Sequence, residues 1–273
     1  MVAWTVARLK DASKTPAVLT RGYKAGGGRS DEAELLKRLC GVQVVVNPDR
    51  ATGAKQAVAA GADVLVMDDG FQHRRLKRDL DIVLIDATCP FGFGHCLPRG
   101  LLREPPSALK NAHAIVITRS DLADAGELRA LRARLRRLAP GASIHLAVHR
   151  PVKLIAPDGN ARKPDALGGK EAFAFCGMGN PEAFFETLER LGAALRGRCA
   201  LDDHVRYAPA TVAALSERAR SAGAKVMVTT AKDAVKISAS AFPLPLWQVV
   251  VEIDVIKGAD ELTRHIRGVA GAS

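Results

Sequence analysis

Two short apolar segments that each end in aspartate constrain the fold of this chain most strongly. Residues 64–67 (VLVM) and 82–85 (IVLI) are rich in β-branched residues and too short to be helices buried on all sides, so we expect buried parallel strands. Asp68 and Asp69 follow the first segment, and Asp86 follows the second. Because ligands bind at the carboxyl ends of strands in open α/β sheets, these acids are candidates for holding Mg²⁺, which prefers oxygen ligands. The alternative is that Asp68 only caps the next element, since so short a pattern is a weak signal.

The segments around these two strands alternate apolar runs with helical patterns. Predicted strands lie at 17–20, 42–46 and 114–118, and predicted helices lie at 2–11, 31–40 and 50–60. This alternation specifies a parallel sheet covered by helices on both faces. The loop at 24–30 carries three glycines, which either approach a phosphate closely or only give flexibility. Asp31 follows this loop, and the residue pattern alone indicates that Asp31 caps the next helix.

A change in composition divides the chain into two parts. The first α/β pattern occupies residues 1–150, and residues 151–170 form a proline- and glycine-rich linker with the turn signal PDGN. A second α/β pattern begins near residue 172. The sequence therefore predicts two α/β domains, at 1–150 and 171–273.

Charge and composition exclude several classes of protein. The 273 residues carry a net charge of +11, which indicates an anionic partner such as nucleic acid, lipid headgroups or a phosphorylated substrate. Only 4% of residues are aromatic, which disfavours a stacking platform for single-stranded nucleic acid. The five cysteines include no CxxC pair, so neither a disulfide framework nor a zinc site is indicated. Without a secretory signal or a membrane-spanning apolar run, a cytoplasmic location is expected.

Two basic segments can be interpreted either as solvated surface or as binding sites for anions. Residues 127–138 form an amphipathic helix with five arginines, which is either a solvated face or a surface for an anionic membrane. The long loop at 87–110 contains Arg99 and Arg103, which are either solvated arginines or a clamp for phosphate groups.

Eight motifs in order cover nearly the whole chain. They are AVLTRGY (17–23), SDE (30–32), VVVNPDR (44–50), ADVLVMDDGFQHRRLKRDLDIVLID (62–86), LPRGLLREP (97–105), FCGMGNPEAFF (175–185), DDHVRY (202–207) and TTAKDAVK (229–236). Together they resemble the tetraacyldisaccharide 4′-kinases of lipid A biosynthesis, and DDGFQHRRL with LREP at this spacing is highly specific. The resemblance implies a P-loop-kinase-like parallel sheet and a second, smaller α/β domain joined by a two-stranded linker.

The resemblance also implies a reaction and its setting. The expected reaction is transfer of the γ-phosphate of ATP, with Mg²⁺, to the 4′-hydroxyl of a tetraacyl glucosamine disaccharide 1-phosphate. The expected partners are this lipid and the anionic inner-membrane surface, with the enzyme peripheral on the cytoplasmic side and no nucleic acid partner. By position in the motifs, Asp31 and His204 correspond to a dyad that activates the sugar hydroxyl. The other implied site residues are the metal ligands Asp68 and Asp69 and the nucleotide-site residues Gln72, Arg103 and Glu104.

The sequence departs from the family pattern in its first residues and at one later position. A GGxGKT Walker A loop and a membrane-associated helix are expected before residue 2, and neither is present; Lys14-Thr15-Pro16 lacks the glycines that would let it wrap a phosphate. Ala231 stands where the family usually has Glu.

One hypothesis is a kinase whose start lies upstream of Met1, and the alternative is a catalytically impaired relic that does not hold ATP. A nucleic-acid binder, motivated by charge alone, ranks third. Without the first strand, a sheet edge or groove is expected to be exposed.

Overall fold

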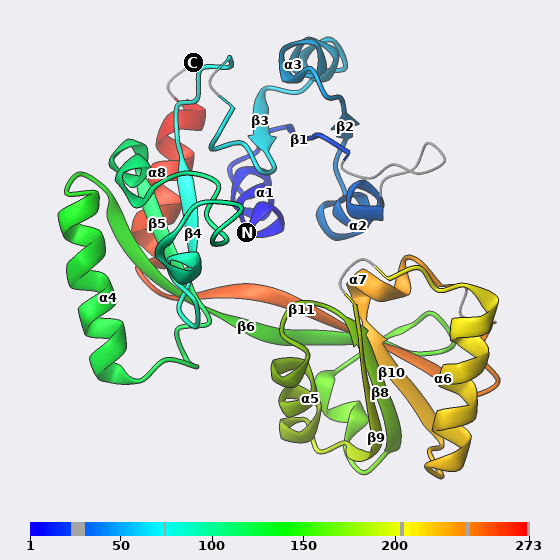
Figure 1. Cartoon of the computed structure of the whole chain (residues 1–273). Coiled ribbons are helices and arrows are strands. Elements are labelled where there is room, and N and C mark those ends of the chain that lie inside the picture. The colour runs from blue at the N-terminus through cyan, green and yellow to red at the C-terminus, as the bar shows by residue number, and fades with distance from the viewer. Residues whose placement is uncertain (23–30, 74, 203–204, 238–240, 272–273) are drawn as a thin grey trace. The chain divides into compact units, whose positions relative to one another are not determined.

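The computed structural model describes residues 1–22, 31–73, 75–202, 205–237 and 241–271. The chain divides into two compact units (Figure 1). Unit 1 comprises residues 1–149 and 253–273, and unit 2 comprises residues 150–252. The predicted C-terminal domain contained all of 171–273, whereas in the structure the last helix belongs to unit 1. This difference arises because the final strand leads back to unit 1, where Leu262 and Ile266 are buried in its core.

Unit 1 contains two parallel sheets. One has the strand order β2-β1-β3 and the other begins with the order β4-β5-β6. Their strands are β1 (Pro16–Thr20), β2 (Val44–Val46), β3 (Val64–Met67), β4 (Ile82–Asp86), β5 (Ala114–Thr118) and β6 (Ser143–Ile155). The α-helices of the unit are α1 (Val2–Lys10), α2 (Asp31–Cys40), α3 (Arg50–Ala59), α4 (Ala125–Leu138) and α8 (Ala259–Gly271), and short 3-10 helices are η1 (Gly92–Gly94) and η2 (Pro106–Asn111).

Helices cover both faces of β5, as its unbroken apolar sequence requires. Ile115 and Ile117 pack in one cluster with Leu131 and Leu135 of α4. The alternate residues Ala114 and Val116 pack in a second cluster that includes Leu9 of α1 and Leu262 and Ile266 of α8. Strand β1 is buried on both faces in the same way, with α3 on one side and α1 and α2 on the other. The predicted doubly covered parallel sheet is therefore confirmed.

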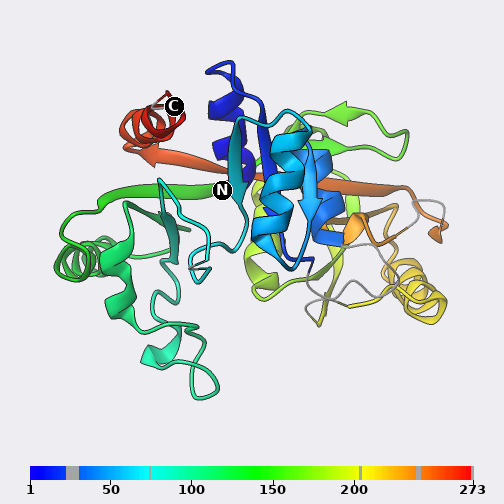
Figure 2. The same cartoon turned by 90° about the horizontal axis from the view of Figure 1, so that it is seen from above.

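Unit 2 is a smaller α/β unit with a parallel sheet in the order β11-β10-β8-β9. Its elements are β7 (Ala161–Arg162), η3 (Pro164–Leu167), β8 (Glu171–Gly177), α5 (Pro181–Arg190), β9 (Ala194–Leu201), α6 (Pro209–Ser221), β10 (Val226–Thr230), α7 (Ala231–Ala234) and β11 (Leu246–Lys257). Helix α5 packs on Ala174 and Cys176 of β8, and α6 packs on Phe173 and Phe175 of the same strand. The long strands β6 and β11 each run from one unit into the other (Figure 2).

Candidate active site

The two aspartates that follow β3 lie on a sharp turn. The amide of Asp68 donates to the carbonyl of Leu19 in β1 at 2.9 Å, so Asp68 still belongs to the sheet edge. Asp69 then adopts the left-handed region at φ +51°, which Asp tolerates better than most residues. A Cβ on the next residue, Gly70, would lie 2.7 Å from the Cβ of Met67, so the tight turn requires glycine there. The chain thus reverses immediately after β3 and leaves both carboxylates at its carboxyl end.

Asp68 lies in an environment that disfavours its negative charge. Burial, together with the nearby carboxylates of Glu32 and Asp69, raises the pKa of Asp68 to about 6. The guanidinium of Arg50 and the amino group of Met1 oppose this shift. A bound cation would offset the repulsion among these carboxylates.

The donor set fits a magnesium ion. Within the part of the chain that the structure describes, no cluster of three or more His, Cys, Asp or Glu side chains is arranged to hold a metal. Mg²⁺ commonly takes only one or two protein carboxylates and completes its coordination with substrate phosphates and water. Asp68 and Asp69 lie together at this edge and would supply these two carboxylates.

Arg50 is a site residue that the sequence analysis missed. Its side chain is buried, and its guanidinium donates to the carbonyl oxygens of Asn47 and Asp68, each at 3.2 Å. Asp49 caps α3 by accepting from the amide of Ala51 at 3.1 Å, which fixes Arg50 as the first residue of this helix. Burial lowers the pKa of Arg50, and the acids Asp68 and Asp69 counteract that effect. The sequence did contain a signal for Arg50: it directly follows the NPD turn that caps the helix, at the end of the motif VVVNPDR (44–50).

The LREP segment reaches the same turn through an ion pair. Arg103 pairs with the Oδ2 of Asp69, and both side chains are more than half exposed. The structure thereby brings together Arg103 with the acids after β3. Gln72 lies close by, since it lines the same cavity as Asp68 and Asp69. Glu104 follows Arg103 in the chain and is partly buried.

A cavity of about 720 Å³ opens in unit 1 beside these acids. Its lining includes β3, β4, residues of α1 and α8, and the turn at 68–72. Strands β3 and β4 are each the last strand of their sheet in this unit, so the cavity adjoins two strand edges. The sequence predicted an exposed edge or groove in this domain, and the structure has one.

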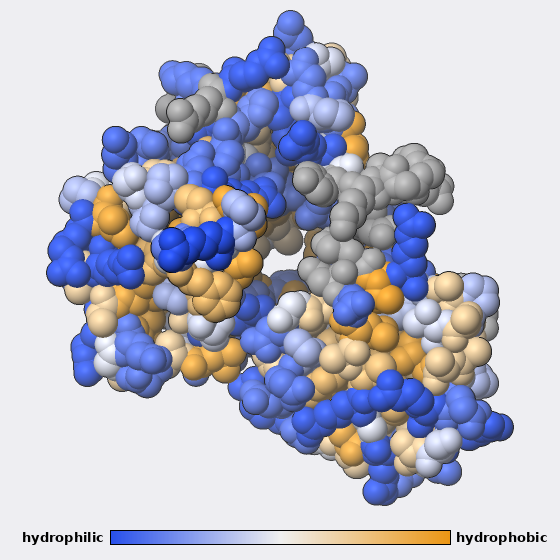
Figure 3. All heavy atoms as spheres, in the orientation of Figure 1, coloured by the Kyte–Doolittle hydropathy of each residue, from blue (hydrophilic) through white to orange (hydrophobic). Residues whose placement is uncertain are grey.

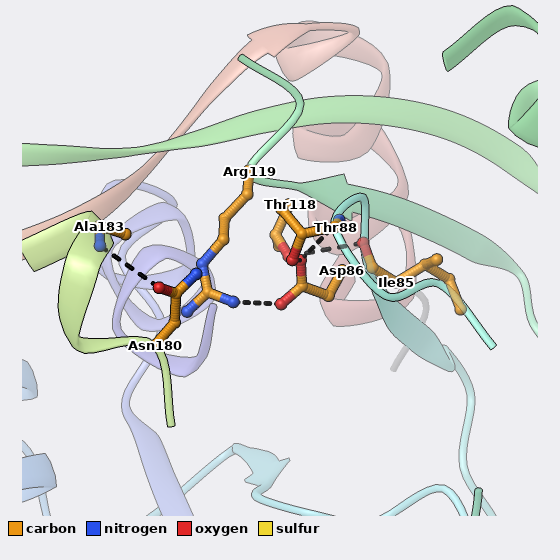
Figure 4. Close-up of polar contacts among 7 residues, drawn as sticks. All are labelled: Ile85, Asp86, Thr88, Thr118, Arg119, Asn180 and Ala183. Atoms are coloured by element: carbon orange, nitrogen blue, oxygen red, sulfur yellow. Dashed lines mark hydrogen bonds and ion pairs between the residues drawn. The ribbon is translucent and has the colours of Figure 1, made fainter. Parts of the chain in front are cut away.

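Asp86 differs from Asp68 although both end an apolar strand. Its Oδ1 accepts from the amide and the hydroxyl of Thr88 at 3.0 and 2.7 Å, and its Oδ2 pairs with Arg119 (Figure 4). The hydroxyl of Thr118 donates to the carbonyl of Ile85 in the same group. Asp86 therefore holds the ends of β4 and β5 together, and its carboxylate already has partners on both oxygens.

The side chains of the two residues of the implied dyad lie outside the described residues. Asp31 is the first residue of α2, and its side chain lies outside the described residues, as does the whole of His204. The start of the DDHVRY segment is close to β8, because a Cβ on Gly177 would lie 3.0 Å from the carbonyl of Asp202. Asp233 adjoins this point, accepting from the amide of Gly177 at 3.0 Å and from the hydroxyl of Thr230 at 2.8 Å. Burial, followed by the charge of Asp233, raises the pKa of Tyr207 at the end of the segment.

Comparisons with known proteins decide the family. A sequence model of the tetraacyldisaccharide-1-P 4′-kinases, LpxK, matches residues 1–270. The chain belongs to this family. A tetraacyldisaccharide 4′-kinase of Anaeromyxobacter dehalogenans (strain 2CP-C) is 41% identical over 281 residues, covering 94% of this chain and 74% of that protein. One from Syntrophus aciditrophicus (strain SB) is 40% identical over 269 residues, covering 87% of this chain and 71% of that protein.

A solved structure of the family has the same fold. The crystal structure of "apo" form LpxK from Aquifex aeolicus in complex with ATP matches with a TM-score of 0.73 and 25% identity, covering 98% of this chain and 82% of that chain. The predicted family, fold class and enzyme class are thus confirmed. Within the residues that the structure describes, no helix of this 4′-kinase is long and apolar enough to cross a bilayer.

Proposed function

We propose that this chain transfers the γ-phosphate of ATP to the 4′-hydroxyl of a tetraacyl glucosamine disaccharide 1-phosphate, the reaction of its family. The observation that carries the proposal is the pair Asp68 and Asp69 on the turn after β3, with Arg50 and Arg103 beside it. The neighbouring LpxK structure is a complex with ATP, which supports ATP as the phosphate donor. No observation favours the alternative of an impaired relic.

Mg²⁺ and the nucleotide would be bound by residues near this turn. Asp68 and Asp69 would hold Mg²⁺, which supplies positive charge to the phosphates of ATP when bound. Arg103 is exposed and close to Asp69, so its planar fork of donors is suited to a phosphate oxygen. Gln72 and Glu104 would orient groups around the same site. Arg50, buried behind Asp68, holds the backbone of the turn in place.

Asp31 and His204 would supply the proton transfer. A carboxylate oriented by an imidazole can accept the proton of the 4′-hydroxyl as its oxygen attacks the γ-phosphate. The basis for these roles is the match to the GDE and D-H-x-x-Y motifs.

The direct test is phosphoryl transfer from radiolabelled ATP to the purified lipid disaccharide 1-phosphate in detergent. We expect labelled product with Mg²⁺, and none with EDTA or with a lipid whose 4′-position already carries a phosphate. The absence of transfer, with ATP affinity no tighter than about millimolar, would contradict the proposal and favour the relic.

Basic residues of unit 1 would attach the enzyme to an anionic membrane. Arg129, Arg136 and Arg137 are exposed on α4, while Leu131 and Leu135 are buried beneath it. Arg75 and Lys77 are exposed between β3 and β4. Arg78, the next residue in the chain, is largely buried and donates to the carboxylate of Asp81 at 2.6 Å, so it is not part of this basic surface.

Charge reversal tests this electrostatic attachment. Replacing Arg129, Arg136 and Arg137 with glutamate is expected to lower affinity for vesicles with about 30% phosphatidylglycerol by at least about 10-fold, since each basic residue near such a surface contributes about 1 kcal/mol. Sedimentation with vesicles measures it, and binding to neutral vesicles is the control. Unchanged affinity would show that α4 does not contact the membrane.

A further inference from the structure

The loop that follows β4 is closed on itself. We call residues 91–102 the FGFG loop; it projects from the rest of unit 1 (Figure 2). Its backbone hydrogen bonds run from Gly94 N to Phe91 O (2.6 Å), Leu101 N to Gly92 O (3.0 Å), Leu97 N to Leu102 O (2.8 Å), Gly100 N to Cys96 O (3.1 Å) and Leu102 N to His95 O (3.2 Å). These bonds give a long loop a defined shape.

Glycines make this closure possible. A Cβ on Gly100 would lie 2.2 Å from the carbonyl oxygen of His95, and a Cβ on Gly92 would lie 2.9 Å from the Cβ of Leu101. Both contacts are too short for any other residue. The backbone of the loop is therefore built to hold one conformation.

The loop presents large apolar side chains to solvent. Phe93 is 76% exposed, Leu97 61% and Leu101 62%. Figure 3 shows hydrophobic residues at the surface beside strongly hydrophilic ones on the face of unit 1 where the segment after β4 passes in Figure 1. By contrast, Phe91 is buried, and the guanidinium of Arg134 lies 3.9 Å from the centre of its ring. The loop thus buries one phenylalanine as its anchor and exposes the other.

The conformation of Phe93 is costly for a phenylalanine. Its φ of +64° is in the left-handed region, which Gly and Asn adopt readily and bulky residues rarely do. Burial of the Phe93 side chain offsets little of this strain, because the residue is 76% exposed. Backbone strain of this kind clusters at functional sites.

The loop itself carries basic but no acidic side chains. Between Asp86 and Glu104 the chain contains no acidic residue, whereas Arg99 and His95 are exposed within the loop. An apolar tip that carries an exposed arginine and no acidic residue complements the interface of an anionic bilayer, where acyl chains lie beneath negative headgroups. The geometry also links the loop to the active site, since Arg103 directly after it pairs with Asp69.

We propose that the FGFG loop docks on an anionic lipid bilayer, with Phe93, Leu97 and Leu101 inserted below the headgroups and Arg99 among them. This docking would bring the turn at Asp68 and Asp69 to the headgroup level, where the sugar of a lipid substrate lies. Its significance for catalysis rests on the proposed kinase function, but the binding itself does not require activity.

The decisive variant is Phe93→Asn, because asparagine fits the left-handed backbone and removes the apolar ring. We expect its affinity for vesicles of phosphatidylcholine with about 30% phosphatidylglycerol to fall about 10-fold at both about 0.1 M and about 0.5 M NaCl. Its melting temperature should be equal to or higher than that of the parent chain. The matched control is Val58→Gln on α3, which removes another exposed apolar side chain, 57% exposed, and should leave vesicle affinity unchanged.

A Phe93→Trp variant reports insertion independently. Relative to the parent chain, which already contains Trp4 and Trp247, the added fluorescence should shift to shorter wavelength with these vesicles and be quenched by brominated lipids. Vesicle affinity within about 2-fold of the parent for Phe93→Asn, with no such shift, would overturn the proposal.

Activity in detergent separates docking from substrate binding. Phe93→Asn should keep the parent kcat and KM for detergent-dispersed lipid disaccharide 1-phosphate. A raised KM there with unchanged vesicle affinity would overturn the proposal and assign the loop to the substrate's acyl chains. If the parent chain transfers no phosphate at all, the proposed function fails, while the vesicle measurements still decide the role of the loop.

Discussion

Replacing Asp68 with asparagine is expected to stabilise the metal-free protein and to lower phosphoryl transfer by at least about 10²-fold. The folded pKa of about 6 lies above the ordinary value of 3.8, so the folded state binds a proton more readily than the unfolded state. The free energy of unfolding therefore falls as pH rises from about 4 to about 6, and stays lowered above that. Asparagine cannot ionise, so at pH 7 it should restore about 1–3 kcal/mol. The loss of activity would follow from the loss of a proposed ligand of Mg²⁺.

The measurement is denaturant unfolding in EDTA at about pH 5 and about pH 7.5, for the parent chain and Asp68→Asn. The stabilisation by asparagine should be present at the higher pH and small at the lower one. Added Mg²⁺ should stabilise the parent chain most at the higher pH, where Asp68 is ionised, and should have little effect on the variant.

Asp86 supplies the matched control for this variant. Its carboxylate pairs with Arg119 and accepts two hydrogen bonds from Thr88, so Asp86→Asn should destabilise the protein by about 1 kcal/mol rather than stabilise it. If Asp68→Asn destabilises the protein as Asp86→Asn does, Asp68 has an unseen structural partner and the proposed metal site is in error.

This contrast shows what sequence could and could not predict about the site. The strands at 64–67 and 82–85 were predicted because β-branched runs flanked by polar residues have few other solutions in an α/β fold. Their terminal aspartates appeared equivalent, since the environment of each is set by residues distant in sequence. Arg119 is 33 positions from Asp86, and Arg103 is 34 from Asp69.

The layers of the fold were predicted more fully than the way in which the chain connects the two units. The burial of both faces of β1, β5 and β8 follows directly from their short, unbroken apolar runs, so the layers of both units could be predicted. The return of the last helix to unit 1 could not, because an amphipathic face such as that of α8 specifies burial but not the partner. Arg50 was missed for the same reason: a charged residue becomes a buried anchor only through carbonyl groups that the fold brings to it.

Asp31→Asn and His204→Ala are each expected to lower kcat by about 10²- to 10⁴-fold, with much smaller changes in KM for ATP and lipid. The reason is chemical: the 4′-hydroxyl must lose its proton as it attacks the γ-phosphate, and these residues are proposed to accept it as one unit. Single-turnover phosphoryl transfer with saturating MgATP measures the chemical step directly.

Two further variants make the dyad hypothesis specific. If the two residues act as a unit, the loss of either one already removes their joint effect. The double variant should therefore be about as slow as the slower single variant. Glu34→Gln is the control on the same helix: Glu34 is paired with Arg38 at 3.2 Å on the surface of α2, so its loss should leave kcat unchanged. Effects that multiply in the double variant would show independent roles, and effects confined to KM would assign both residues to binding. Either outcome would contradict a dyad of Asp31 and His204, and would leave the proposed metal site at Asp68 and Asp69 to be tested by its own variants.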